Sequence, residues 1–414
     1  GGATTSKMHT AVKIDPHYQH PVVYVPDASR CVSVASQLLS DTHRPAFLAD
    51  LKEEYDHYRE RFQAKMDKRE FLKIDTAREN RLKCDWRSYQ PPMPNEPGLH
   101  SLIDFPIATL IDYIDWTPFF STWELRAKFP RVLDHEEFGE QARQLYADAL
   151  EMLNDFVDNK SISANAVFGL LPANSVDHDD IEIYADHSRE QVISRVTGLR
   201  QQSVHPGENP NLCLADFIAP RDSGAQDHIG AFAVTAGIGL DKLVEAYEAD
   251  DDIYHSIMAK ALADRLAEAF AEYLHEHVRK QAWGYASDEQ FDRVDLIKEQ
   301  YRGIRPAPGY PANPDHLQKL DIWEILKVEE ATGISLTESL AMWPAASVSG
   351  WYFSHPQSQY FGVGKIDEDQ VADYAARCDI DIDLAERRLA SNLGYLPERE
   401  KAGNATCQKE ALVA

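Results

Sequence analysis

The residues best suited to binding a charged ligand lie in a proline-rich segment, residues 305–314, with the sequence RPAPGYPANP. Its four prolines fix the backbone φ angle at four points, and Gly309 can adopt angles that other residues avoid. The planar guanidinium of Arg305 suits a carboxylate because it can donate to both oxygens at once, and Tyr310 offers a ring face and a hydroxyl. The pattern fits either a rigid ligand-binding loop or a polyproline connector between two helices.

A second candidate is a row of carboxylates on a long helical stretch at about residues 253–280. Asp264, Glu268 and Glu272 are four residues apart, so they share one face of an alanine-rich helix. Like charges at this spacing repel by roughly 0.2–0.5 kcal/mol per pair. A positively charged ligand, a neighbouring basic side chain or bulk water would offset the repulsion. The face is therefore either a cation-binding surface or a solvated one.

Two further segments place polar groups among aromatic ones. Asp115 lies in the run YIDWTPFF, where its carboxylate either caps the following helix or faces a ligand. Residues 351–364 fit two β-type runs joined by a polar turn, and the aromatic residues there, Tyr360 and Phe361 among them, line either a sheet core or a flat pocket for a base. Residues 177–180, DHDD, fit an exposed turn better than a metal site.

Composition narrows the classes of partner. The chain has 42 Lys and Arg against 68 Asp and Glu, a net charge of −26, which repels phosphate backbones and anionic lipid. Nucleic acid and membranes are therefore poor partners. The five cysteines lie far apart, and no apolar run approaches the roughly 20 residues that span a bilayer, which favours a cytoplasmic location. Because the first residue is Gly1, we expect a fragment of a longer protein.

The elements that must position these residues alternate irregularly. Residues 21–25 form a β-type run, residues 27–39 show helical spacing, and a charged stretch at about 47–69 predicts an exposed linking helix. Beyond the prolines at 91–97, helical patterns cover about residues 138–158, 188–203, 241–282, 288–301, 315–332 and 367–392, and β-type runs include 166–171, 181–184 and 347–353. With no βαβ rhythm and no repeat of fixed period, we expect an α+β domain.

Three segments together resemble the activation domain of cobalamin-dependent methionine synthase. They are RPAPGY from Arg305, YIDWTPFF from Tyr113, and AMWPAASVSGWYFSHP from Ala341. In that family, oxidised and inactive cob(II)alamin is returned to methylcobalamin by one electron from a flavodoxin-type partner and a methyl group from S-adenosylmethionine. The activation domain binds the methyl donor and caps the corrin. The resemblance therefore implies a reductive reactivation module of a methyltransferase.

The resemblance also implies a domain organisation. Residues 66–414 would form the S-adenosylmethionine-binding activation domain, an α+β, C-shaped structure with a central antiparallel sheet flanked by helices. Residues 1–65 would form a partial α/β, Rossmann-like remnant of the cobalamin-binding domain of the same enzyme, followed by the linking helix. The His loop that ligates cobalt and the cysteines that hold zinc do not occur in the sequence. Cobalamin would thus be bound mainly, and zinc entirely, outside this chain, and the parent enzyme would transfer methyl from methyltetrahydrofolate to homocysteine to make methionine.

Site residues follow from their positions in the family's motifs. S-adenosylmethionine would contact Asp115, Glu268, Arg305, Ala307, Gly309, Tyr310, Tyr360 and Phe361, and cobalamin would contact Gly1, Gly2 and Ala28. Arg305 would bind the donor's carboxylate, and Asp115 and Glu268 would favour its ammonium or sulfonium charge. No catalytic nucleophile or base is expected, because the cobalt itself attacks. Some relatives have a second tyrosine where this chain has Phe361.

Two other functions fit the sequence. The chain would be a non-catalytic corrin cap that recruits the flavodoxin-type donor, or a free-standing methyltransferase, although the Gly-rich loop usual in the latter is absent from the sequence. We expect the electron donor to dock at a basic cluster, since an acidic chain needs a local positive patch to meet an acidic partner. That cluster consists of Arg59, Arg61, Lys65, Lys68 and Arg69.

Overall fold

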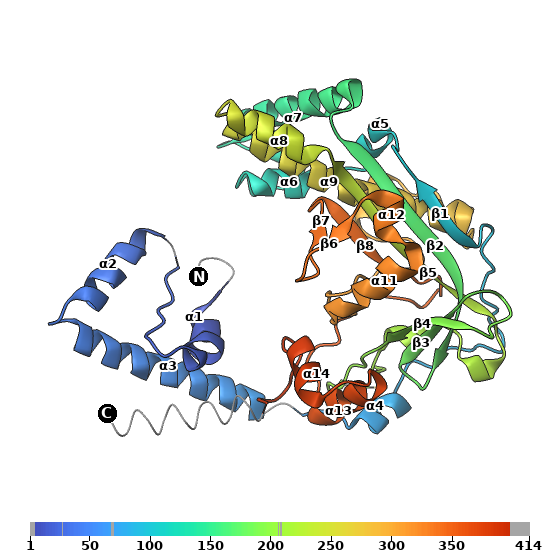
Figure 1. The fold of residues 1–414 in the computed structure, drawn as a ribbon, viewed down its shortest axis with the longest axis horizontal. Coiled ribbons are helices and arrows are strands. Elements are labelled where there is room, and N and C mark those ends of the chain that lie inside the picture. Colours follow the sequence, from blue (N-terminus) through green and yellow to red (C-terminus); the bar gives the residue numbers. More distant parts are fainter. Residues whose placement is uncertain (1–4, 27, 68–69, 206, 208, 398–414) are drawn as a thin grey trace. The chain divides into compact units, whose positions relative to one another are not determined.

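The computed structural model describes residues 5–26, 28–67, 70–205, 207 and 209–397 (Figure 1). The chain divides into two compact units. The larger consists of residues 75–201 and 207–364, and the smaller of residues 1–74, 202–206 and 365–414. The boundary expected between residues 65 and 66 stays a prediction. Within the described ranges, no helix combines the length and the apolar character needed to cross a bilayer.

An antiparallel sheet forms the centre of the larger unit (Figure 1). In the described part of the chain it has six strands, in the order β4-β3-β2-β5-β8, with β1 also paired to β2. The strands are β1 (Gly98–Leu102), β2 (Ser163–Val176), β3 (Asp180–Tyr184), β4 (Val192–Thr197), β5 (Asp227–Ile238) and β8 (Ser347–Tyr352). All neighbours run antiparallel, which confirms the expected α+β class.

Helices cover both faces of this sheet. Alternate residues of β2 point to opposite faces, so Phe168 and Leu170 belong to one apolar core and Val167 and Leu171 to the other. The first core includes α5 (Ile107–Ile111), α6 (Trp116–Thr122), α7 (Gly139–Asn159), α8 (Leu240–Ala249) and α9 (Ile253–His277). The second includes α11 (Lys319–Leu326) and α12 (Val328–Thr332). Because a core lies against each face of the sheet, β2 and β5 are buried along almost their whole length.

Helix α9 carries the predicted row of carboxylates. Its first turn is capped by Asp252, whose side chain accepts a hydrogen bond from the His255 amide at 3.1 Å. Leu262 and Leu266 are fully buried in the core that faces the sheet, and the small alanines between them allow close packing. The larger unit also contains α10 (Arg293–Ile297) and the hairpin of β6 (Ser335–Leu336) and β7 (Met342–Trp343). Of α4 (Ile74–Glu79), Ile74 is assigned to the smaller unit and the other residues to the larger.

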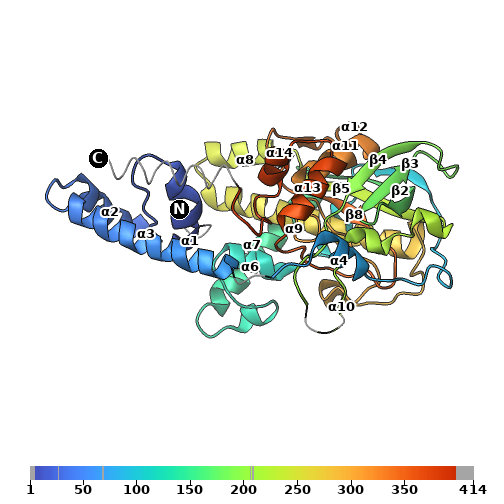
Figure 2. The same cartoon turned by 90° about the horizontal axis from the view of Figure 1, so that it is seen from below.

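Three separate stretches of chain build the smaller unit. Its helices are α1 (Lys7–His9), α2 (Ala28–Leu39), α3 (Arg44–Asp67), α13 (Glu368–Arg377) and α14 (Ile382–Arg388), of which α13 and α14 pack side by side (Figures 1 and 2). The buried amide of Gln202 joins the stretches. Its Nε2 donates to Leu72 O at 2.9 Å and to Asp369 Oδ1 at 2.8 Å, and its Oε1 accepts from the Asp367 amide at 2.8 Å.

Several sequence predictions are wrong in detail. Residues 21–25 do not form a strand, because the Tyr55 hydroxyl takes the place of a neighbouring strand: it accepts from Tyr24 N at 3.1 Å and donates to Val22 O at 2.9 Å. The helix predicted at 188–203 is wrong, because residues 192–197 form β4 and pair with β3, in keeping with their β-branched side chains.

Other helical patterns are interrupted. The stretch at 241–282 breaks between α8 and α9, where Asp251 has a φ of 58°, and the stretch at 288–301 is helical only in α10. The helices α2, α3 and α7 confirm the predictions at 27–39, 47–69 and 138–158, except that residues 27, 68 and 69 lie outside the described part of the chain.

A buried charge network contradicts the expected exposed turn at residues 177–180. Asp179 and Asp180 are both fully buried, although Asp177 and His178 do form a turn. Arg200, also fully buried, donates from Nε to Asp179 Oδ1 at 2.7 Å. Its Nη1 and Nη2 donate to the two carboxylate oxygens of Asp216, each at 2.8 Å. Paired acids can be buried, and their partners here are distant in sequence.

We predict that Arg200→Ala lowers the free energy of unfolding by about 3–5 kcal/mol, because it leaves the carboxylate of Asp216 buried without its counter-charge, whereas Asp179 keeps its ion pair with Arg78 at 2.7 Å. Urea denaturation followed by circular dichroism measures the loss. The matched control is Arg221→Ala, which removes an arginine that is 62% exposed and pairs with Glu182 at 3.2 Å. A loss below about 1 kcal/mol is expected for it. Equal losses for the two variants would contradict the prediction.

Candidate functional site

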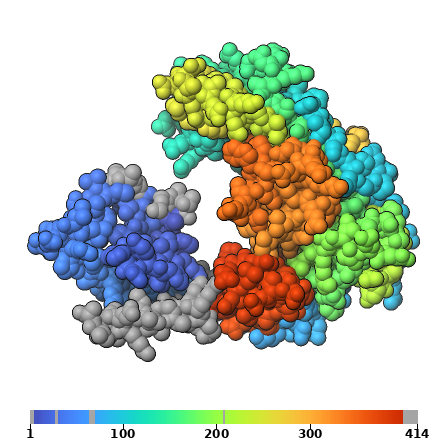
Figure 3. Space-filling model, viewed as in Figure 1, coloured from blue at the N-terminus to red at the C-terminus, as the bar shows by residue number. Residues whose placement is uncertain are grey.

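A cavity of about 570 Å³ in the larger unit contains most of the predicted ligand contacts. The proline-rich segment and β8 form two of its walls, and the orange part of the chain that supplies them lies at the molecular surface (Figure 3). Six of the eight residues expected to contact S-adenosylmethionine line it: Glu268, Arg305, Ala307, Tyr310, Tyr360 and Phe361. The fold thus brings together residues that are up to 93 positions apart in the sequence.

The proline-rich segment is a rigid wall because it is fixed at both ends. Trp351 of β8 donates its amide to Pro306 O at 2.9 Å, which attaches the segment to the edge of the sheet. Gly309 donates its amide to Asn313 O at 2.7 Å and has a φ of 91°, the left-handed region that favours glycine. A β-carbon at this position would lie 2.2 Å from Cε1 of His316. Gly309 therefore shapes the turn without itself lining the cavity.

The guanidinium of Arg305 makes hydrogen bonds through one of its nitrogens, Nη1, in the described part of the chain. Its Nη1 donates to Glu272 Oε2 at 2.7 Å and to the Tyr301 hydroxyl at 3.3 Å. Within the described part of the chain, Nε and Nη2 have no hydrogen-bond partner. These two nitrogens form the edge of the fork that can meet both oxygens of a carboxylate.

The row of carboxylates on α9 serves three different purposes. Glu272 is paired with Arg305, Glu268 lines the cavity, and Asp264 is 58% exposed with Arg265 at 3.7 Å. The face is therefore neither a plain solvated surface nor a continuous cation site. The repulsion between the carboxylates is offset in part by Arg305 of the proline-rich segment. The spacing of residues along the helix does not reveal this partner.

Aromatic side chains border the cavity. The Tyr360 hydroxyl accepts a hydrogen bond from the Arg305 amide at 3.0 Å, so it also helps to fix the proline-rich segment. Tyr360 is 41% exposed and Tyr310 is 65% exposed, which leaves their rings open to a ligand or to a partner. Phe361 packs edge-on against Phe217, with ring centroids 6.3 Å apart, and so combines the core and the pocket roles considered for it.

Two of the other predicted residues, Asp115 and Ala28, do not line the cavity. Asp115 is the N-cap of α6, where its Oδ1 accepts from the Thr117 amide at 3.0 Å, and it is not among the residues that line the cavity. Its contact with a ligand stays a prediction. Gly1 and Gly2 lie outside the described residues, and Ala28 is the first residue of α2 in the smaller unit. The cobalamin contacts predicted for these three stay predictions.

Sequence reasoning missed two charged residues of the cavity, Glu299 and Lys319. Burial raises the pKa of Glu299, an effect that the nearby Arg305 opposes and Glu272 reinforces. Lys319 donates to Leu340 O at 2.8 Å, and burial lowers its pKa. Neither residue belongs to a local motif. Only the folding of distant segments brings each of them to the cavity wall.

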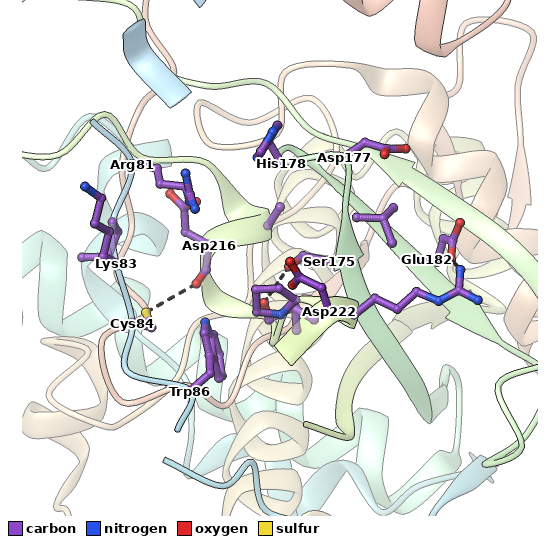
Figure 4. Close-up of a pocket in the computed structure, with 16 residues that line it drawn as sticks. Arg81, Lys83, Cys84, Trp86, Ser175, Asp177, His178, Glu182, Asp216 and Asp222 are labelled. Atoms are coloured by element: carbon purple, nitrogen blue, oxygen red, sulfur yellow. Dashed lines mark hydrogen bonds and ion pairs between the residues drawn. The ribbon is translucent and has the colours of Figure 1, made fainter. Parts of the chain in front are cut away.

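A second cavity, of about 670 Å³, has a different character (Figure 4). None of the predicted site residues lines it. Three of its acids are engaged in ion pairs: Glu182 with Arg221 at 3.2 Å, Asp177 with Arg195 at 2.6 Å, and Asp216 with Arg200 at 2.8 Å. Burial raises the pKa of Cys84 to about 12, so this thiol stays protonated and is a poor nucleophile. In the described ranges, no group of three or more His, Cys, Asp or Glu side chains is arranged to hold a metal ion.

Comparison with known proteins agrees with the residues of the first cavity. Residues 106–379 match the family described as vitamin B12 dependent methionine synthase, activation domain. The chain belongs to this family. All three segments that carried the resemblance fall within the match, so the activation-domain assignment made from them is confirmed. The family is part of a methyltransferase, methionine synthase.

A solved activation domain is similar to most of this chain. It is described as the crystal structure of the MetH reactivation domain bound to AdoHcy, S-adenosylhomocysteine. The two are 53% identical, with a TM-score of 0.77, over 79% of this chain and 99% of that chain. The mixed helices and antiparallel sheet described above match that activation-domain fold.

We predict that Gly309→Ala destabilises the protein by roughly 1–3 kcal/mol, because alanine would be strained at a φ of 91° and would collide with the His316 ring. The melting temperature, followed by differential scanning fluorimetry, measures the effect. Gly362→Ala is the matched control, since the β-carbon would meet Pro311, a residue of the cavity wall, at an ordinary 3.5 Å. A melting temperature for Gly309→Ala as high as that of the control would refute the strain.

Proposed function

We propose that this chain binds S-adenosylmethionine in the 570 Å³ cavity and presents its methyl group to cobalamin held by another domain of the same methionine synthase. The observation that carries the proposal is that Arg305, whose Nε and Nη2 have no hydrogen-bond partner among the described residues, lines the same cavity as Glu268 and Glu299. The similar activation domain bound to S-adenosylhomocysteine supports the same ligand class.

The charges of the cavity complement the charges of the methyl donor. S-adenosylmethionine has one carboxylate, which the free edge of Arg305 would bind through two charge-assisted hydrogen bonds. It also has an ammonium and a sulfonium, which Glu268 and Glu299 would stabilise from the cavity wall. The rings of Tyr360 and Phe361 offer flat faces for the adenine. Asp115 is retained in the proposal as a further contact for the donor's positive charge.

The module works by orientation, with no nucleophile of its own. Cobalamin, when bound, supplies the metal that takes the methyl group after reduction by one electron. The protein's contribution is to hold the sulfonium at a fixed place and to keep the amino-acid tail away from the mouth of the cavity. The exposed ring of Tyr310 fits a flat, largely apolar macrocycle at that mouth. The proposal includes Gly1, Gly2 and Ala28 as minor cobalamin contacts.

We also propose the reaction of the parent enzyme and the source of the electron. The parent enzyme would transfer methyl from methyltetrahydrofolate to homocysteine in the cytoplasm, and a flavodoxin-type protein would supply the electron. The predicted docking cluster has less free charge than its composition indicates, because Arg59 pairs with Asp15 and with Asp56. Arg61 is exposed, whereas Lys68 and Arg69 lie outside the described residues.

We predict that Arg305→Ala weakens S-adenosylmethionine binding by about 1.5–3 kcal/mol, the range for hydrogen bonds to a charged group. Isothermal titration calorimetry measures the affinity, and methyl transfer to a separately supplied cobalamin-binding domain should fall with it. Arg293→Ala is the matched control, since it removes the same charge at a residue that is 53% exposed and pairs with Asp112 at 3.1 Å. Unchanged affinity in Arg305→Ala would remove this residue from the site.

The raised pKa of Glu299 predicts a pH-dependent preference between donor and product. An ionised carboxylate attracts the sulfonium of S-adenosylmethionine, whereas S-adenosylhomocysteine has a neutral sulfur. Because the pKa is raised, protonation on acidification begins at a higher pH than for an ordinary glutamate. The ratio of the two affinities should therefore fall as the pH is lowered from about 7 to about 5. In Glu299→Gln the ratio should change little with pH, and an unaltered slope would exclude Glu299 as the cause.

A further inference from the structure

A stack of buried rings lies behind Arg305, on the side away from its free edge. His275 and Tyr352 are both fully buried, with nearly parallel rings whose centroids are 5.1 Å apart. Tyr301 meets His275 edge-on at 4.9 Å. Burial holds the pKa of His275 well below its usual range, with Arg279 and Arg305 acting in the same direction, so the ring is neutral and does not repel the guanidinium.

The stack is anchored by a second ion pair. Arg279 lies over the ring of Tyr301, with 3.9 Å between its guanidinium carbon and the ring centroid. Its Nη2 donates to Glu289 Oε1 at 2.6 Å and its Nε donates to Glu289 Oε2 at 3.0 Å. Tyr301 is thereby fixed from the far side, and its hydroxyl presents a stationary acceptor to Arg305.

Glu272 makes the shortest hydrogen bond to the Arg305 side chain, and among the described residues Arg305 is its one hydrogen-bond partner. Its Oε2 accepts from Arg305 Nη1 at 2.7 Å, while its Oε1 is buried without a hydrogen bond in the part of the chain that the structure describes. The same Nη1 lies 3.3 Å from the Tyr301 hydroxyl and 3.5 Å from Nδ1 of His275. Three groups therefore surround one end of the guanidinium.

Fixing one nitrogen of a planar guanidinium fixes the direction of the others. We infer that Glu272 is a positioning residue: it holds Nη1 so that the Nε–Nη2 edge faces the carboxylate of the ligand, and it does not itself line the cavity. This inference rests on the proposed function, because it assumes that the ligand's amino-acid tail binds to Arg305. Glu272 belongs to the row of carboxylates that the sequence offered as a cation-binding face, but it is not among the residues predicted to contact the ligand and does not line the cavity.

Two electrostatic effects of Glu272 oppose each other. A second carboxylate on the same guanidinium repels the ligand's carboxylate, which by itself would weaken binding. Without Glu272, however, Arg305 would be free to turn toward Glu268 or Glu299 across the cavity. Such a pair would close the free edge and would also neutralise an acid that the positive end of the ligand needs. We therefore expect the orientation of Arg305 to outweigh the repulsion between Glu272 and the ligand's carboxylate, so that the loss of Glu272 weakens ligand binding.

The test compares two ligands that differ in the tail. S-adenosylhomocysteine has the carboxylate, whereas 5′-methylthioadenosine has the same nucleoside and thioether without the amino-acid tail. In calorimetric titrations of the full chain, Glu272→Ala should lower the affinity for S-adenosylhomocysteine by about tenfold. Its affinity for methylthioadenosine should stay within about twofold of the wild-type value. Asp264→Ala, which removes an exposed charge from the same face of α9, should change neither affinity.

A second variant provides the test if Glu272→Ala does not fold. Glu272→Gln keeps the shape and an acceptor oxygen, so it should show the same selective loss at a smaller size, about threefold. Thermal denaturation identifies which variants fold, and the inference is judged on the folded ones. Equal weakening of both ligands would show that Glu272 only supports the fold, and an unchanged or tighter S-adenosylhomocysteine would also overturn the inference.

The proposed function fails in a different way from the inference. If Arg305→Ala does not discriminate between the two ligands, the carboxylate does not bind at Arg305 and the proposed function is wrong at its central contact. If Arg305→Ala discriminates and the folded Glu272 variants do not, only the positioning role is wrong.

Discussion

The ion pair between Arg305 and Glu272 is the constraint on which the cavity depends. It joins the proline-rich segment to the long helix α9, two parts of the chain that no local motif connects. A guanidinium enclosed by protein is stable only when a counter-charge and hydrogen bonds replace its water. Here, within the described residues, the hydrogen bonds to the guanidinium all come from one side, from Glu272, Tyr301 and His275. The opposite side is left with unused donors, which is the condition for binding an anion strongly.

Rigidity reaches this ion pair from the sheet. Strands β2 and β5 are buried on both faces, so their positions are fixed by two cores at once. Strand β8 pairs with β5 and holds the proline-rich segment through the bond from Trp351 N to Pro306 O. From the other face, α9 carries Glu272 to the same point. The site is thus assembled where a strand edge and a helix meet, and neither needs to move for the donors to be aligned.

Local sequence was sufficient for the segments whose chemistry is local. The stiffness of residues 305–314, the capping role considered for Asp115 and the helices at 27–39, 47–69 and 138–158 follow from residue types and spacing. Spacing failed where distant residues decide the outcome. It could not show that Asp179 and Asp180 are buried and paired with arginines. It also could not show that the Tyr55 hydroxyl replaces a neighbouring strand for residues 21–25, or that Glu299 lines the cavity. Each of these depends on a pairing made only in the folded chain.

The bonds of Gln202 have a consequence for the order in which the protein folds. They tie Leu72 to residues 367–369, almost 300 positions later in the chain. During synthesis, which proceeds from the N-terminus, the larger unit is complete before α13 leaves the ribosome. Residues near Leu72 must therefore wait, with part of their apolar surface exposed, until the last helices are made. The smaller unit closes late, because contacts between distant segments form slowly.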